Sequence, residues 1–122
     1  MKLLFTGDVC FKYQPELDET MAKAALENLL PIFRQADYRV MNLETPLCPE
    51  GIGAPIEKSG PNIVGRPENA AFLTVAGCDC AILANNHTGD YGDDALFATL
   101  DILDSRGIAH TGAGANIDEA YI

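Results

Sequence analysis

Apolar positions follow two alternating patterns along the chain. Short apolar runs of strand length recur at intervals, and segments with apolar residues at helical spacing lie between them. This alternation is typical of a parallel β-sheet whose strands are joined by crossover helices. The strands are predicted at residues 2–6, 38–42, 78–84 and 108–110. The pattern therefore predicts an α/β fold built on a four-stranded parallel sheet.

Helical spacing predicts a helix in each connection between these strands. The first helix begins near Asp18, and Pro31 interrupts it and starts a short helical piece over residues 32–35. The apolar face of this first helix comprises Ala22, Ala25, Leu26 and Leu29. Further helices are predicted over residues 67–77, closed by a glycine, and over residues 90–106, with the first residue as the N-cap.

The Gly- and Pro-rich stretch from Pro46 to Pro67 predicts a long ordered loop with room for a short hairpin. Loops of this length are uncommon in compact domains unless they have a function. Near the end of the chain, Asn116 and Glu119 form a near capping box for a helix with little chain left to follow it. We therefore expect residues 1–122 to be a single domain that forms the N-terminal part of a longer one.

The charge balance of the 122 residues is strongly acidic. Eight basic against eighteen acidic side chains give a net charge of −10, which opposes binding to nucleic acids or to anionic membranes. Such a chain can bind phosphate only locally, through metal ions or a small cluster of donors. The sequence contains neither the apolar run of a signal peptide nor a membrane span, so we expect a cytoplasmic protein.

The four cysteines, Cys10, Cys48, Cys78 and Cys80, are predicted to be free. A chain of this length needs no disulfide to build a core, and the spacing of the cysteines matches no zinc template. Cys78 and Cys80 share one face of an extended segment. They are either a ligand pair or two small buried hydrophobic residues, and the second interpretation is favoured.

Polar or glycine-rich segments follow each predicted strand, where ligands of open parallel sheets bind. The strand endings are Gly7-Asp8, Asn42-Leu43-Glu44, Asn85-Asn86-His87 and Gly112-Ala113-Gly114. Two carboxylates, a carboxamide and an imidazole at one edge form a ligand set for divalent metals. Each also has a structural explanation: a turn cap for Asp8, a solvated charge for Glu44, Asx-turn geometry for the asparagines and a carbonyl hydrogen bond for His87. Their common placement favours a metal site.

These endings resemble those of the capsule-synthesis CapA family, which is linked to poly-γ-glutamate synthesis and is similar to calcineurin-like metallophosphoesterases. The resembling segments are Gly7-Asp8-Val9, Asn42-Leu43-Glu44-Thr45-Pro46, Lys58-Ser59-Gly60-Pro61, Ala84-Asn85-Asn86-His87-Thr88-Gly89-Asp90-Tyr91-Gly92 and Gly112-Ala113-Gly114. The resemblance spans nearly the whole chain. It implies the N-terminal half of an α-β-β-α sandwich, and it places Cys10, Cys78 and Cys80 at apolar positions of the family, which favours their burial.

The resemblance also implies roles for individual residues. The metal ligands would be Asp8, Glu44 and Asn86, the catalytic residues His87 and Asp90, and the substrate-binding residues Asn85 and Lys58. The cofactors would be two divalent ions (Mn, Fe, Zn or Mg), and the Glu44 carboxylate would bridge them. The later histidines of the family have no counterpart here, because the chain has only two histidines. We therefore expect an incomplete site, with weak metal affinity and negligible turnover in these residues alone.

The implied function is that of a metal-dependent phosphoesterase associated with poly-γ-glutamate capsule biosynthesis, acting on a phosphorylated or polyglutamate-type substrate. The alternative is a non-catalytic module of a polyglutamate synthesis or export assembly, which would bind through the loop of residues 46–67. The proposed metal ligands and His87 favour chemistry, because a binding module does not need that combination. One sheet face would lack its covering layer and expose an apolar patch, to be covered by self-association or by a partner.

Overall fold

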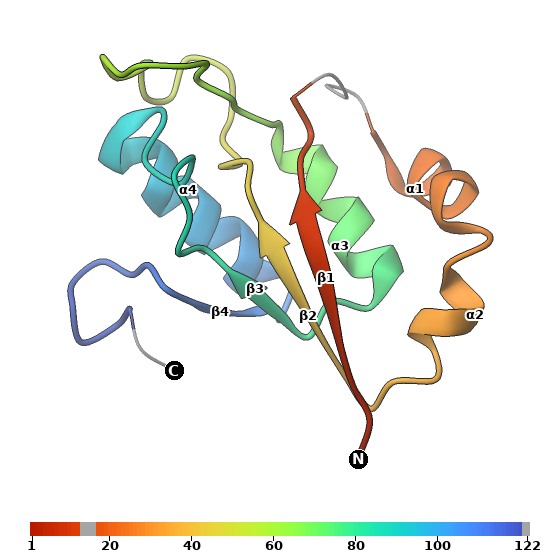
Figure 1. The fold of residues 1–122 in the computed structure, drawn as a ribbon. Coiled ribbons are helices and arrows are strands. Elements are labelled where there is room, and N and C mark those ends of the chain that lie inside the picture. The colour runs from red at the N-terminus through yellow and green to blue at the C-terminus, as the bar shows by residue number, and fades with distance from the viewer. Residues whose placement is uncertain (13–16, 121–122) are drawn as a thin grey trace.

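The computed structural model describes residues 1–12 and 17–120, and it contains one four-stranded parallel sheet (Figure 1). The strands, in spatial order, are β1 (Leu3–Val9), β2 (Tyr38–Leu43), β3 (Cys80–Ile82) and β4 (Ala109–Thr111). Each strand pairs in parallel with the next one along the chain. The predicted α/β fold with a parallel sheet is confirmed.

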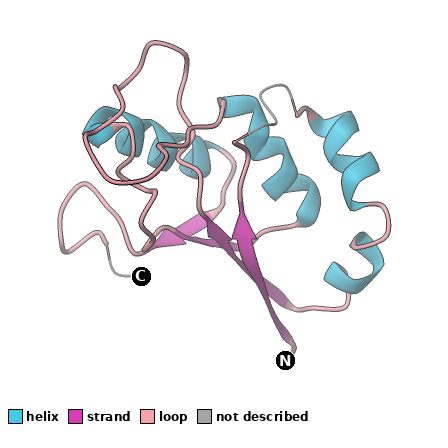
Figure 2. Ribbon diagram, turned by 45° about the horizontal axis from the view of Figure 1, so that its top comes forward, coloured by secondary structure: helices cyan, strands magenta, loops and turns pink. Residues whose placement is uncertain are grey.

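The helices all lie on one side of the sheet, as Figure 2 shows. They are α1 (Glu19–Leu26), α2 (Leu30–Phe33), the 3-10 turn η1 (Pro67–Asn69), α3 (Ala70–Ala76) and α4 (Gly92–Ser105). Every connection moves one strand further in the same direction across the sheet. Because parallel crossovers share one hand, connections that all move the same way place their helices on the same face.

The two faces of the sheet therefore differ in burial. On the helix side, Met41 and Leu83 are buried in the core together with helical leucines. On the other side, Leu3, Phe5 and Tyr38 are exposed by 51%, 65% and 39%. The predicted uncovered face is thus present among the described residues, and what covers it stays a prediction. No helix in the described part of the chain combines the length and the apolar character that a membrane crossing requires.

The boundaries of the first two helices differ from the predicted ones. Asp18 is the N-cap of α1, and its carboxylate accepts a hydrogen bond from the Met21 N–H at 2.8 Å. However, α1 ends at Leu26, so the prediction that Leu29 belongs to its buried face is wrong: Leu29 is 45% exposed. Ala25 is also exposed. Pro31 lies in the first turn of α2, which begins two residues earlier than predicted, because proline fits a first turn.

The strands also shift relative to the predicted ranges. β1 continues to Val9, past a register shift between Phe5 and Asp8. β3 begins only at Cys80, since the residues before it complete the end of α3: Gly77 adopts a left-handed conformation, and the Cys78 N–H donates to Leu73. β4 starts one residue later than predicted and ends at Thr111.

The loop between β2 and η1 contains no hairpin among its described residues. Its two ends are held together instead by a single parallel bridge between Leu47 and Gly65. A Cβ at position 65 would lie 2.8 Å from Cδ2 of the buried Leu47, so only glycine fits here without displacing that side chain. The buried Thr99 of α4 exchanges hydrogen bonds with the Leu47 backbone at 2.9 and 3.1 Å. The loop is therefore anchored to the core at its base.

All four cysteines are free, as predicted. Cys78 and Cys80 are buried, and burial of Cys78 raises the pKa of its thiol to about 12, so both behave as core residues. The expected burial of Cys10 is wrong: this residue is exposed just beyond the end of β1.

Candidate functional site

The predicted site residues lie where β1, β2 and β3 end at the same edge of the sheet. Asp8 is in register with Asn42, and the Glu44 N–H donates to the Val9 carbonyl at 3.1 Å. His87 follows β3 in the loop that leads to α4, and its Nε2 lies 3.6 Å from Oε1 of Glu44. The parallel topology thus brings carboxylate and imidazole groups from three separate strands to one edge.

The His87 ring is held from its other side by Asp90. Nδ1 of His87 lies 2.7 Å from Oδ2 of Asp90, and the two residues are three apart in one tight turn. A carboxylate can only accept a hydrogen bond, so Nδ1 carries the proton and donates it. Nε2 consequently faces Glu44 and the site. The side chains of His87 and Glu44 are 13% and 21% exposed.

Asp90 is fully buried, with 0% exposure. Its Oδ1 accepts from the Lys58 ammonium, while Oδ2 accepts from the Ile63 backbone N–H at 2.8 Å as well as from His87. A buried carboxylate without such partners would be unfavourable by several kcal/mol, on the order estimated for isolated buried ions. Burial raises the pKa of Asp90, but the hydrogen bonds from Lys58, His87 and Ile63 outweigh it and hold the pKa below its ordinary value.

The prediction that Asp90 is the N-cap of the following helix is wrong. That position belongs to Tyr91, whose side chain makes no capping hydrogen bond, and α4 begins at Gly92. The Asp90 carboxylate instead faces inward to the Lys58–His87 cluster. An ion pair across 32 residues has therefore taken precedence over a local cap that the sequence favoured.

The lowered pKa of Asp90 predicts how stability depends on pH. Its contribution is fully present above the pKa of an unfolded aspartate, about 4, and is lost as the pH falls through the lower folded-state pKa. We expect the folded protein to exceed its Asp90→Asn variant in stability by a constant margin between pH 5 and 7, and by a shrinking margin below about pH 4. Urea unfolding of both proteins at each pH measures this margin, and one that stays constant to pH 2 would contradict the prediction.

Asn85 organises the turn that carries His87. Its Oδ1 accepts from the backbone N–H groups of His87 and Thr88 at 3.0 and 3.1 Å, and its Nδ2 donates to the Leu43 carbonyl at 2.9 Å. This is the Asx-turn geometry considered for the asparagines from the sequence. Neighbouring Asn86 is exposed, and its carbonyl accepts from Lys58 at 3.3 Å.

Sequence reasoning missed Asn42. Its Nδ2 donates to Oδ1 of Asp8 at 2.6 Å, and its Oδ1 accepts from Nδ2 of Asn85 at 3.2 Å. Asn42 therefore links the Asp8 carboxylate to the turn after β3 and orients it. The signal was present, because an asparagine ends the strand that pairs with the strand of Asp8, but it was considered only as part of the Asn42–Glu44 ending.

The donor set supplies part of what a divalent metal needs. Asp8, Glu44 and Asn86 offer oxygen ligands, which suit hard divalent cations, and Asn42 orients one of them as an outer-shell partner does. Within residues 1–12 and 17–120, no group of three or more His, Cys, Asp or Glu side chains is close enough to hold a metal ion. The residues therefore fit the chemistry of a divalent ion without completing its coordination.

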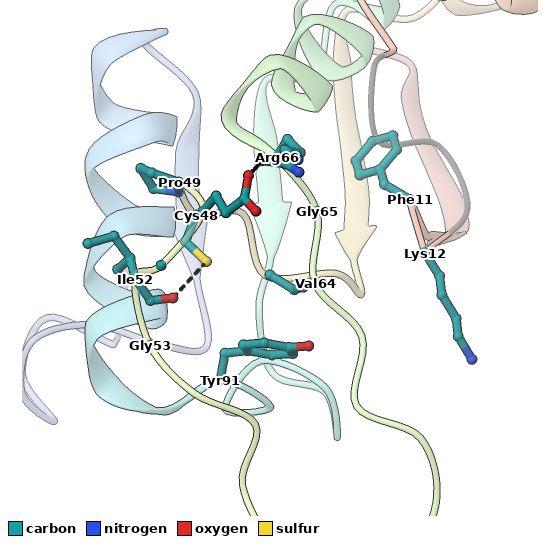
Figure 3. A pocket seen from close by; sticks show the side chains of 12 residues that line it. Phe11, Lys12, Cys48, Pro49, Ile52, Gly53, Val64, Gly65, Arg66 and Tyr91 are labelled. Carbon is teal, nitrogen blue, oxygen red and sulfur yellow. Dashed lines mark hydrogen bonds and ion pairs between the residues drawn. The ribbon is translucent and has the colours of Figure 1, made fainter.

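A pocket of about 300 Å³ lies along the loop between β2 and η1 (Figure 3). It is formed mainly by the loop after β2, and Tyr91, which follows Asp90, contributes its ring. Within it, the Cys48 thiol donates to the Ile52 carbonyl at 3.4 Å, and Arg66 pairs with Glu50 at 2.9 Å. The lining contains none of the predicted metal ligands, but Asp8 lines a second pocket of about 370 Å³ together with Phe11.

Comparison with protein families supports the resemblance seen in the sequence. Residues 2–122 match the family described as bacterial capsule synthesis protein PGA_cap. A comparison with curated proteins finds no match. The family match covers the three strand endings that form the site and the loop that carries Lys58. The chain therefore belongs to the PGA_cap family of bacterial capsule synthesis proteins.

Proposed function

We propose that this chain provides one half of a metal-dependent phosphoester hydrolysis site that serves capsule biosynthesis. The observation that carries the proposal is the connected arrangement of Glu44, His87 and Asp90. A buried carboxylate fixes the imidazole through Nδ1, and the free Nε2 faces a second carboxylate 3.6 Å away. A packed core histidine would not need a carboxylate on each side of its ring.

In this proposal, Asp8, Glu44 and Asn86 hold the divalent ions. When bound, such ions activate water and offset negative charge on the phosphoryl oxygens. His87 acts as the general acid in its imidazolium form, in which Nε2, the ring nitrogen turned toward the site, carries a proton that it passes to the leaving oxygen. Asp90 holds the ring in one orientation through its hydrogen bond with Nδ1. Asn42 keeps the Asp8 carboxylate turned toward the same edge.

Divalent ions also reconcile the proposed substrate with the charge of the chain. At a net charge of −10, the protein repels anions at long range. Divalent ions held by Asp8, Glu44 and Asn86 would reverse the local charge, so that a phosphorylated substrate, or a phosphorylated intermediate of polyglutamate synthesis, could bind. The competing proposal, a non-catalytic polymer-binding module, needs no such reversal and no oriented imidazole.

A manganese titration of the full-length natural protein tests the proposal. We expect Glu44→Gln and Asp8→Asn each to weaken Mn²⁺ binding at least about 100-fold. Loss of a residue that only hydrogen-bonds to a metal ligand already lowers metal affinity about 10–100-fold. Asp101→Asn, at an exposed position of α4, is the matched control and should leave the affinity unchanged. Phosphodiesterase and phosphomonoesterase assays accompany the titration. Equal metal affinity in all four proteins, with no turnover, would favour the binding module instead.

A further inference from the structure

Lys58 lies in the middle of the loop between β2 and η1, yet its ammonium sits inside the His87 turn. It contacts Oδ1 of Asp90 directly, the Asn86 carbonyl at 3.3 Å and Nδ1 of His87 at 3.2 Å. The Lys58 side chain is only 19% exposed. A lysine placed to bind a phosphoryl group would keep its ammonium open to the site, whereas this one is directed to acceptors of the protein.

The hydrogen positions at this cluster follow from the donor chemistry. Lysine has three donors and no acceptor, and Nδ1 of His87 donates to Asp90. Lys58 therefore does not bond to the ring itself. Its hydrogen bonds go to Asp90 and to Asn86, and it acts on His87 through the carboxylate that both of them share.

The loop around Lys58 is hydrogen-bonded to Asp90 and Tyr91, mostly through their backbone carbonyls. The Ile56 N–H donates to the Asp90 carbonyl at 3.0 Å, and the Ile63 N–H donates to Oδ2 of Asp90 at 2.8 Å. The Ala54 N–H donates to the Tyr91 carbonyl at 3.2 Å. Residues that precede and follow Lys58 in sequence thus bind the loop to the turn that carries His87. Lys58 adds the positive charge that pairs with the Asp90 carboxylate.

We propose that Lys58 is a positioning residue, which holds the Asp90 carboxylate so that Asp90 fixes the His87 ring with Nε2 toward Glu44. The catalytic consequence rests on the proposed function, but the positioning does not. The loop of residues 46–67 thereby becomes part of the site without touching substrate. It sets the placement of His87 from a segment distant in sequence.

The first test is spectroscopic and needs no activity. The full-length protein is compared with Lys58→Met, with Lys58→Arg, and with Lys23→Met, which removes an exposed lysine paired with Glu19 at 2.6 Å. We expect Lys58→Met to shift the imidazole ¹⁵N signals of His87 and to speed amide exchange at Ile56 and Ile63 at least tenfold. Lys58→Arg should retain most of the normal pattern, and Lys23→Met all of it. Unchanged His87 signals in folded Lys58→Met would overturn the proposal.

The second test separates positioning from substrate binding. We expect Lys58→Met to lower kcat by about 10–100-fold, the usual effect of losing an outer-shell partner, with KM changed less than about threefold. A raised KM with normal kcat would overturn the proposal in favour of substrate binding. In an Asp90→Asn background, Lys58→Met should add little, because the group through which Lys58 acts is already altered. A full additional loss in the double variant would also overturn it.

The two tests fail in distinguishable ways. If the normal protein hydrolyses no phosphoester, the proposed function fails, while the His87 signals and the exchange rates still decide the role of Lys58. If Lys58→Met does not fold, Lys58→Arg and the double variant with Asp90→Asn, in which no buried charge is left unpaired, provide the comparison. Normal His87 signals in the double variant, or a further shift of these signals relative to Asp90→Asn alone, would overturn the positioning role.

Discussion

Replacing Asp90 by alanine is expected to lower the free energy of unfolding by about 3–5 kcal/mol, the range for breaking a buried ion pair by removing one partner. The substitution leaves the Lys58 ammonium, the Nδ1–H of His87 and the Ile63 N–H without their shared acceptor. It also removes the group to which both the His87 turn and the long loop are attached. Urea unfolding followed by circular dichroism measures the loss.

The control for this substitution is Asp101→Ala, which removes an exposed aspartate of α4 and should change stability by less than about 0.5 kcal/mol. Asp90→Asn should lie between the two, because its amide oxygen can still accept while its charge is gone. A loss below about 1 kcal/mol for Asp90→Ala would mean that the cluster is held together by the surrounding backbone and not by the carboxylate.

The architecture was predictable because local and global signals agree. Apolar runs at strand spacing and apolar stripes at helical spacing alternate along the whole chain, and each predicted strand has its counterpart in the sheet. The placement of all helices on one face follows from the strand order and the hand of the crossovers. Phe5 is exposed because it lies on the face of the sheet that these helices do not cover.

Two of the errors concern residues at helix ends. Leu29 has the spacing of a core residue, but α1 ends three residues before it, and the chain turns into α2. Asp90 has the character of an N-cap, but Lys58 and His87 draw its carboxylate inward. Lys58 cannot be identified as a partner from a window of helical length around Asp90, since the two residues are 32 apart in sequence.

The sequence predicted where the candidate site lies, but it did not predict the hydrogen bonds between the site residues. Parallel strands deliver their endings to one edge, so Glu44 and His87 could be expected together from the sequence. The hydrogen bonds that orient them could not, because Asn42 and Lys58 act through the geometry of the folded edge. Residues that hold ligands in place leave a weaker sequence signal than the ligands themselves, since several residue types can supply one hydrogen bond.

Under the proposed function, in which His87 is the general acid, substitution of His87 by asparagine is expected to lower kcat for phosphoester hydrolysis by about 10²–10⁴-fold. Asparagine keeps a polar side chain of smaller size in a partly buried position but cannot transfer a proton at the position of Nε2. His110→Asn is the matched control, since it alters the other histidine of the chain, which contacts Asp104 of α4 at 3.2 Å. It should leave kcat unchanged.

The choice of leaving group makes the His87 prediction specific. A general acid helps most when the departing oxygen is strongly basic, because that oxygen must be protonated as the bond breaks. The loss in His87→Asn should therefore be larger for phenyl phosphate than for p-nitrophenyl phosphate, whose leaving group departs readily as an anion. A loss of equal size for the two substrates would instead assign His87 to binding or to the support of Glu44, because neither of those roles depends on the basicity of the leaving oxygen.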